Sequence, residues 1–143
     1  MAIMKGDAMK IIIIGGSGGI GRAFVELLAK RESVGSIVAS YHQTTPVFQH
    51  PKVSWQRLDL ANETAIQSWS EQLDEIDWLI NAAGMLHQPD HGPEKSIRQW
   101  EPDFFLKNIK INAIPTLLLA KHLQAHFKPG RKSLFATVSA KVG

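Results

Sequence analysis

A glycine-rich turn is the part of this sequence whose residue types and spacing could do chemistry by themselves. Gly15, Gly19 and Gly21 follow an unbroken apolar run, and an amphipathic segment begins immediately after them. A helix that starts at such a turn directs unpaired backbone N–H groups and its positive dipole end at whatever lies above it. Because glycine has no Cβ, phosphates can approach the main chain closely. The turn therefore predicts a site for a nucleotide diphosphate.

One alternative for this turn stays open, and another is excluded. A generic tight turn with good helix packing would also use glycines here. In that case the three spaced glycines would all pack against protein rather than face a ligand. A phosphate-binding P-loop is excluded, because no Gly-Lys-Ser/Thr follows the glycines.

Histidines raise the question of a metal site. His122 and His126 are four residues apart, a spacing that places two metal ligands on one helical face. No glutamate lies between them as in a zincin, and no third ligand is evident. We therefore favour a solvated helix face and predict no metal site. His87 and His91 lie among Pro and Gly residues and are predicted to be exposed loop residues.

Composition narrows the class of protein. With 143 residues, 44% of them hydrophobic, the chain can bury one core. Its formal net charge is +3 and its charges are interspersed, so we expect no nucleic-acid surface. The absence of cysteine excludes disulfides and thiolate metal sites. No apolar stretch reaches the 18 residues of a membrane helix, and the opening segment is too polar for a signal peptide, so we expect a soluble, cytoplasmic protein.

Alternating strand and helix patterns must position the turn. Residues 1–8 are predicted to form a flexible leader, and residues 9–143 one α/β domain built on a doubly wound parallel sheet. The predicted strands span residues 9–14, 36–40, 53–58, 77–82 and 132–139, and the predicted helices span residues 19–31, 62–73 and 102–127. We expect the strand order 3-2-1-4-5 with right-handed crossovers, and a sheet truncated after strand five.

The predicted helices have further expected features. An apolar face should unite four residues of the first helix: Ile20, Phe24, Leu27 and Leu28. Asn62 is a plausible N-cap for the second helix. Pro115 should remove one hydrogen bond from the long third helix and bend it.

Four motifs now carry a family resemblance. The glycines have the spacing Gly-x-x-x-Gly-x-Gly, Asp59-Leu60 follows the third predicted strand, and Asn81-Ala-Ala-Gly84 follows the fourth. Asn112 lies in the long predicted helix. In these motifs, and in this order, the chain resembles the N-terminal part of a short-chain dehydrogenase/reductase. The ending Ser-Ala-Lys-Val-Gly143 also resembles the small carbonyl-reductase and C-factor-like branch.

The resemblance implies a Rossmann fold and an NAD(P)H-dependent oxidoreductase that reduces a small carbonyl or oxidises an alcohol. It implies the following cofactor-binding residues: Gly15, Ser17, Gly18, Gly19, Ile20, Gly21, Tyr41, His42, Asp59, Leu60, Asn81, Ala82, Ala83 and Gly84. For Asp59 the alternative is an acid that leads a helix, and for Asn81 a structural tie between strands.

The family's catalytic residues are only partly matched. Asn112 matches the family's catalytic asparagine, although it could equally be a polar residue satisfied within its helix. The spacing of the family's catalytic serine falls on Ala140, and Ser139 is one residue early. A local shift would bring Ser139 into place, so Ser139 is the candidate catalytic serine. The family's Tyr-x-x-x-Lys pair would follow Gly143, and Tyr41, the only tyrosine, cannot replace it. We therefore expect this chain to supply the cofactor-binding half and to be inactive alone. The alternatives are a non-enzymatic nucleotide-binding or signalling protein and an inactive fragment.

The choice of cofactor depends on the exit of the second predicted strand. An acid there would bind a ribose 2′-OH and repel a 2′-phosphate. The segment Ser40-Tyr-His-Gln-Thr44 holds no acid, which favours NADP, with Ser40, Tyr41 and His42 as neighbours of the phosphate, although NAD stays possible. Leu134, Phe135 and Val138 would form an exposed apolar edge. Besides a small-molecule substrate we therefore expect a second copy as partner, or else a missing remainder of the chain that covers this edge.

Overall fold

The computed structural model describes residues 8–84 and 92–139. Most of the predicted leader, the predicted loop histidines His87 and His91, and Ala140 lie outside the described residues.

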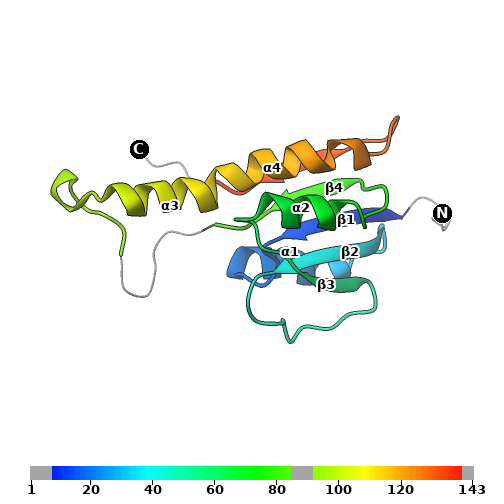
Figure 1. Ribbon diagram of the computed structural model, residues 1–143. Coiled ribbons are helices and arrows are strands. Elements are labelled where there is room, and N and C mark those ends of the chain that lie inside the picture. Colours follow the sequence, from blue (N-terminus) through cyan, green and yellow to red (C-terminus); the bar gives the residue numbers. More distant parts are fainter. Residues whose placement is uncertain (1–7, 85–91, 140–143) are drawn as a thin grey trace.

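Five parallel strands are connected by helices along the chain, except that a loop without a helix joins β2 to β3 (Figure 1). The strands are β1 (Met9–Ile14), β2 (Val34–Tyr41), β3 (Val53–Arg57), β4 (Trp78–Asn81) and β5 (Leu134–Thr137). The α-helices are α1 (Gly19–Ala29), α2 (Glu63–Ser70), α3 (Pro102–Asn112) and α4 (Ile114–Leu123), and two short 3-10 helices that the sequence did not predict are η1 (Ile97–Gln99) and η2 (Gln124–His126).

The sheet has the order β3-β2-β1-β4-β5, and every strand pair is parallel. The predicted fold class and strand order are thus confirmed. Strand β1 lies at the centre and pairs with β2 on one side and β4 on the other. Because all strands run the same way, their carboxyl ends meet at one edge of the sheet, where ligands bind in open α/β sheets.

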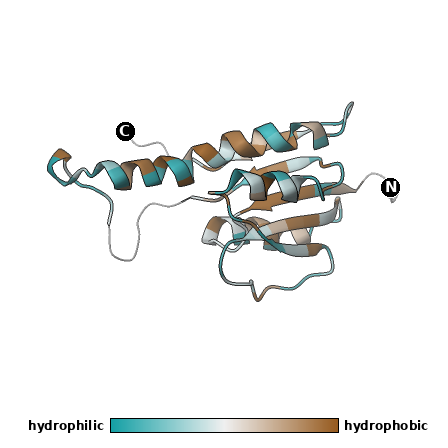
Figure 2. Ribbon diagram, viewed as in Figure 1, coloured by the Kyte–Doolittle hydropathy of each residue, from teal (hydrophilic) through white to brown (hydrophobic). Residues whose placement is uncertain are grey.

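The isoleucine run of β1 supplies both faces of the core, because successive side chains of a strand point to opposite sides. Ile12 and Ile14 pack with helices α2 and α4 on one face. Ile11 and Ile13 pack with helix α1 on the other. All four side chains are buried, so β1 is the strand that a two-sided parallel sheet requires. Figure 2 shows the hydrophobic colouring of the central strands and of much of α4.

The predicted apolar face of α1 is wrong in part. Ile20 and Leu27 are 57% and 54% exposed. The buried face consists instead of Gly21, Val25 and Ala29. Small side chains at four-residue spacing let α1 approach the strands closely, and this contact decides which face turns inward. Hydrophobicity alone pointed to the larger residues.

Helix α2 begins where the sequence predicted and ends three residues earlier. The Asn62 side chain accepts a hydrogen bond from the backbone N–H of Ala65 at 3.2 Å, which confirms the predicted N-cap. The next residue, Glu63, contacts α4: its Oε1 lies 2.6 Å from Lys121 Nζ and 3.0 Å from His122 Nε2. The His122 side chain is mostly buried in this contact, so the prediction of a solvated face is wrong for His122.

The long helix predicted over residues 102–127 is divided into α3 and α4. The helical pattern is interrupted at Ala113, and Pro115 lies in the first turn of α4, where its missing N–H costs no hydrogen bond. Figure 1 shows α4 lying along the sheet while α3 continues beyond the carboxyl ends of the strands. The proline therefore starts a new helix instead of bending an existing one.

A buried carboxylate connects several strands at their amino ends, away from the carboxyl ends where ligands bind. Asp77, immediately before β4, accepts a hydrogen bond from the backbone N–H of Lys10 at 2.8 Å. Its other oxygen lies 3.3 Å from Nε of Arg131, in the loop before β5. One side chain thus ties together the start of β1, the start of β4 and the approach to β5.

Strand β5 is an edge strand and is shorter than predicted. Leu134, Phe135 and Val138 are each about two-fifths exposed, which confirms the predicted apolar edge. Association with a second copy through this edge stays a prediction. Among the described residues, none of the helices combines the length and the apolar character needed to cross a membrane.

Candidate functional site

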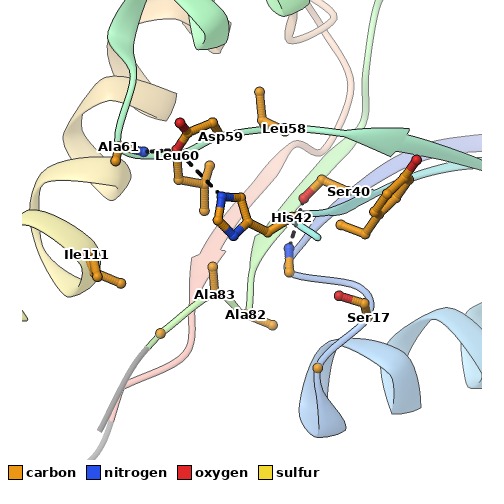
Figure 3. A pocket seen from close by; sticks show the side chains of 14 residues that line it. Ser17, Ser40, His42, Leu58, Asp59, Leu60, Ala61, Ala82, Ala83 and Ile111 are labelled. Carbon is orange, nitrogen blue, oxygen red and sulfur yellow. Dashed lines mark hydrogen bonds and ion pairs between the residues drawn. The ribbon is translucent and has the colours of Figure 1, made fainter. Parts of the chain in front are cut away.

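A cavity of about 320 Å³ lies at the carboxyl ends of the parallel strands (Figure 3). Its walls come from the turn after β1, the exits of β2, β3 and β4, and the end of α3. The lining residues are Gly15, Ser17, Gly18, Ser40, Tyr41, His42, Leu58, Asp59, Leu60, Ala61, Ala82, Ala83, Gly84 and Ile111. Segments far apart in the sequence therefore meet where the fold predicts a ligand.

The turn after β1 is built around Gly15, which adopts a positive φ of 72°. Such a conformation is readily accessible only to glycine. A Cβ at this position would also lie 2.8 Å from the backbone N and Cα of Ala83. Gly15 is therefore required both by its own conformation and by the close approach of the β4 exit.

The spaced glycines divide into two roles. A Cβ on Gly21 would overlap the carbonyl oxygen of Gly15 and lie 2.7 Å from its carbonyl carbon. A Cβ on Gly19, in contrast, would meet no atom within 4 Å. Gly15 and Gly21 thus serve protein packing, while Gly19 faces open space. Gly15 also lines the cavity, so the cofactor-binding role of the three glycines stays a prediction. The open space at Gly19 argues against the alternative in which all three pack against protein.

Helix α1 presents its N-terminus to this open space. Its N-cap is Gly18, and no side chain of the described residues caps it. The first turn holds no acidic residue that would neutralise the positive end of the helix dipole. Uncapped backbone donors beside an open glycine fit a phosphate or pyrophosphate group.

Ser40 lines the cavity and also supports the glycine turn. Its side chain is buried, and its Oγ accepts a hydrogen bond from the N–H of Gly15 at 3.0 Å. Its carbonyl oxygen accepts another from Gly16 at 2.8 Å. Ser40 therefore anchors the glycine turn to β2, and its place as a neighbour of a 2′-phosphate stays a prediction. The next two residues, Tyr41 and His42, were predicted to bind the cofactor, and both line the cavity.

The exit of β3 forms the opposite wall. Asp59 Oδ1 accepts a hydrogen bond from the N–H of Ala61 at 2.9 Å, which fixes the turn that holds Leu60. The same oxygen lies 4.0 Å from Nε2 of His42, an interaction drawn in Figure 3. Asp59 thus lines the cavity and also fixes the turn that leads into α2, so its predicted cofactor contact and its alternative as a helix-leading acid both stay open.

A second cavity of about 460 Å³ adjoins the first, since both contain Ser17 and His42. It lies between the start of α1 and the loop from His42 to Phe48, and it includes Arg22. The Arg22 side chain is exposed and its Nε lies 2.6 Å from Glu26 Oε1. The loop directly after β2, residues 42–48, contains no arginine. Sequence reasoning missed this cation because it comes from α1.

The exit of β4 is held by Asn81. The Asn81 side chain is buried; its Oδ1 accepts from the N–H of Ala83 at 3.1 Å and its Nδ2 donates to Thr116 Oγ1 at 3.1 Å. Since Asn81 does not line the cavity, the structural alternative is the one that the contacts favour. Ala82, Ala83 and Gly84 form the wall that this side chain supports.

Of the two candidate catalytic residues, Asn112 lies beside Gly84 and Ser139 follows β5. Asn112, the last residue of α3, places its Oδ1 3.3 Å from the position that a Cβ on Gly84 would occupy. Its Nδ2 donates to Asn108 Oδ1 at 3.4 Å, a contact within the helix. Ser139 is exposed, two residues after the end of β5. The structure brings Asn112 to Gly84, and the catalytic roles of both residues stay predictions.

The residues predicted to bind cofactor and the residues that line the cavity are overlapping but different sets. Four residues predicted to bind cofactor do not line the cavity, namely Gly19, Ile20, Gly21 and Asn81, and three lining residues were missed, namely Leu58, Ala61 and Ile111. The alternation of β3 could have indicated Leu58, whereas Ile111 depends on where α3 ends. In the described ranges, no three His, Asp or Glu side chains gather as metal ligands would.

This fold is a parallel α/β sheet with a glycine turn and a helix N-terminus at the carboxyl ends of its strands, the place where dinucleotides bind in folds of this class. A family profile described as short chain dehydrogenase matches residues 9–143, and the chain belongs to that family. No curated protein matches the chain in a sequence comparison.

Solved structures share the fold. A short chain dehydrogenase family protein from Francisella tularensis has a TM-score of 0.75 at 21% identity, covering 91% of this chain and 50% of its own. An NADPH-bound carbonyl reductase from chicken fatty liver has a TM-score of 0.70 at 18% identity, covering 83% and 48%. An aldohexose dehydrogenase from Thermoplasma acidophilum has a TM-score of 0.77 at 18% identity, covering 93% and 49%. The chain spans about half the length of these proteins.

Proposed function

We propose that this chain is the dinucleotide-binding part of an NADP(H)-dependent oxidoreductase that reduces a small carbonyl compound or oxidises an alcohol. The observation that carries the proposal is the cavity at the carboxyl ends of the strands, with the open glycine and the uncapped start of α1 beside it. Membership of the short chain dehydrogenase family supports the reaction class.

Successive parts of the cavity wall suit successive parts of a dinucleotide. The start of α1 and Gly19 suit the pyrophosphate, because backbone N–H groups and the helix dipole favour anions. The apolar walls at Leu58 and Leu60 suit an adenine ring. Gly84, at the other end, leaves room beside Asn112 for the nicotinamide end. A nicotinamide cofactor would supply hydride transfer there.

Arg22 supports NADP as the cofactor. The second cavity adjoins the adenosine side of the first through Ser17 and His42, and Arg22 is the fully charged side chain in it. Its Nε contacts Glu26 Oε1, and the guanidinium carries further N–H donors on its two terminal nitrogens. An arginine in this position would pair with a 2′-phosphate by charge-assisted hydrogen bonds. None of the residues that line the second cavity is acidic.

The candidate catalytic residues have limited roles in this chain. We infer that Asn112 orients groups at the Gly84 end of the cavity and that Ser139 follows the strand beside it. Tyr41 lines the cavity at the exit of β2, on the side of His42, and not beside Asn112. The family's Tyr-x-x-x-Lys pair is not matched in this sequence, so we expect negligible carbonyl reduction by this chain alone, because general acid–base catalysis is worth roughly 10²–10⁴-fold.

Equilibrium titration of the chain with NADPH and with NADH tests the proposal. We expect NADPH to bind more tightly. Arg22→Gln should weaken NADPH binding by about tenfold and leave NADH within about twofold, because a charge-assisted contact to the 2′-phosphate would be lost.

Arg31→Gln is the matched control, since Arg31 is an exposed cation just beyond the other end of α1. An equal loss in both variants would show a general charge effect instead of a phosphate contact. Tighter binding of NADH would overturn the NADP preference alone. If neither dinucleotide bound, the oxidoreductase proposal would be wrong.

A further inference from the structure

The hydroxyl of Thr116 lies where three elements of the site meet. Thr116 is in the first turn of α4, and its Oγ1 accepts a hydrogen bond from Asn81 Nδ2 at 3.1 Å. The same oxygen lies 3.4 Å from Oγ1 of Thr137, the last residue of β5. One hydroxyl can accept from the amide and share its own proton with the second hydroxyl. Thr116 therefore connects α4 with the exits of both β4 and β5.

This contact sets the orientation of the Asn81 carboxamide. An amide group can be turned about its terminal bond at little cost unless hydrogen bonds at both ends select one orientation. Thr116 holds the nitrogen, so the oxygen faces the N–H of Ala83, from which it accepts at 3.1 Å. Loss of the Thr116 hydroxyl would leave a buried amide N–H without its acceptor, which is unfavourable.

Ala83 transmits this constraint to the cavity. The backbone of Ala83 is so close to Gly15 that a Cβ on Gly15 would lie 2.8 Å from its N and Cα atoms. The glycine turn and the β4 exit therefore fit against each other with no spare space. A shift of Ala83 by a few tenths of an ångström would change both the wall at Gly84 and the turn that leads to the start of α1.

We propose that Thr116 is a positioning residue for the bound dinucleotide, acting through Asn81 and Ala83 without touching the ligand. The inference rests on the proposed function, because it concerns the same cavity. Thr116 does not line that cavity, and its effect comes through the two hydrogen bonds of Asn81. The same hydroxyl aligns Thr137, two residues before Ser139, so it also relates the end of β5 to the Gly84 wall.

Two ligands of different reach distinguish positioning from a general loss of structure. NADPH would span the cavity from the Arg22 side to the Gly84 end, whereas adenosine 2′,5′-bisphosphate would occupy the Arg22 and His42 side. Thr116→Val, which keeps the shape and removes the hydroxyl, should weaken NADPH by about three- to tenfold and adenosine 2′,5′-bisphosphate by less than about twofold. Thr116→Ser restores the hydroxyl and should return NADPH affinity to within about twofold of the wild-type value.

Thr64→Val is the matched control, because Thr64 is an exposed threonine of α2 away from the cavity. Amide NMR spectra of the unliganded chain give a readout that needs no cofactor: Thr116→Val should displace the Ala83 and Gly15 resonances, and Thr64→Val should not. If Thr116→Val folds poorly, the Thr116→Ser variant and Thr137→Val carry the comparison, with Thr137→Val expected to have a smaller effect than the loss of the Asn81 acceptor.

The inference is wrong if Thr116→Val binds NADPH like the wild type, or if both ligands weaken equally. It is also wrong if the Ala83 resonance is unchanged. Failure of the wild-type chain to bind either ligand would instead refute the proposed function, and it would remove the positioning role together with it, even where the amide shifts were seen.

Discussion

The contrast between Gly19 and Gly21 separates ligand binding from protein stability. In Gly21→Ala the new methyl group would overlap the carbonyl oxygen of Gly15, and the atoms it meets are backbone atoms that cannot rotate away. Overpacking of this kind costs about 1–3 kcal/mol, and the severe overlap places this site at the upper end. The helix propensity of alanine offsets at most about 1 kcal/mol. We expect a net loss of about 2 kcal/mol.

Gly19→Ala should behave in the opposite way. A Cβ there meets no protein atom within 4 Å, so the fold loses nothing and gains up to about 0.5–1 kcal/mol from the reduced freedom of the unfolded chain. The methyl group would occupy the space that the pyrophosphate needs. We expect NADPH binding to weaken by about tenfold or more, which corresponds to at least about 1.4 kcal/mol.

Thermal unfolding and dinucleotide titration of the same two variants provide the assay. A net loss of 2 kcal/mol should lower the Tm of Gly21→Ala by about 6–10 °C for a domain of this size. The Tm of Gly19→Ala should be unchanged or higher. The reasoning is refuted if Gly19→Ala binds NADPH normally, since the open space would then not be the phosphate site. A Gly21→Ala protein as stable as the wild type would refute the packing role.

Two further predictions concern stability. Asp77→Ala removes the buried acceptor of the Lys10 N–H and should lower the free energy of unfolding by about 2–4 kcal/mol, measured by urea denaturation. Hydrogen bonds from Lys121 and then His122 hold the pKa of Glu63 below its usual value of 4.5, so its contribution to stability is present above about pH 4.5 and is lost as pH falls through the lowered pKa. Glu63→Gln should therefore be less stable than the wild type at neutral pH, and thermal melts should show the difference closing in acid.

Matched variants distinguish these effects from a general loss of charge. Asp74→Ala changes an exposed aspartate before the same strand and should alter the unfolding free energy by less than about 0.5 kcal/mol. An equal loss at Asp74 and Asp77 would contradict the role of the buried carboxylate. Glu32→Gln, at an exposed glutamate after α1, should melt like the wild type at every pH. A wild-type melting curve for Glu63→Gln across the acid range would contradict the contact with α4.

Local patterns predicted the strand order and the position of the glycine turn well. The isoleucines of β1 must be buried on both sides, and the glycines after them allow only a tight turn into a helix. The roles of the individual glycines could not be predicted, because they depend on how close Gly15 comes to Ala83 and Gly21 to Gly15. The sequence shows where a glycine stands, but it does not show which neighbouring atom lies too close for a Cβ.

Contacts between distant segments account for what the sequence did not predict. Arg22 reaches the loop after β2 only because α1 starts beside that loop, and Ser40 is occupied by Gly15 only because β1 and β2 pair in one register. The inward face of α1 was assigned to Ile20 and Leu27 by hydrophobicity, while the close approach of the helix selected smaller side chains. In each case the deciding partner lies in another element.

The central place of β1 has a consequence for hydrogen–deuterium exchange. Its amides are paired within the sheet and covered by helices on both faces, so they should be among the slowest to exchange, while those of the edge strand β5 should exchange much sooner. Gly15 follows this strand directly and is bound to β2 through Ser40. The floor of the cavity is thus attached to the most protected part of the molecule, and a ligand arriving there should find it already in shape.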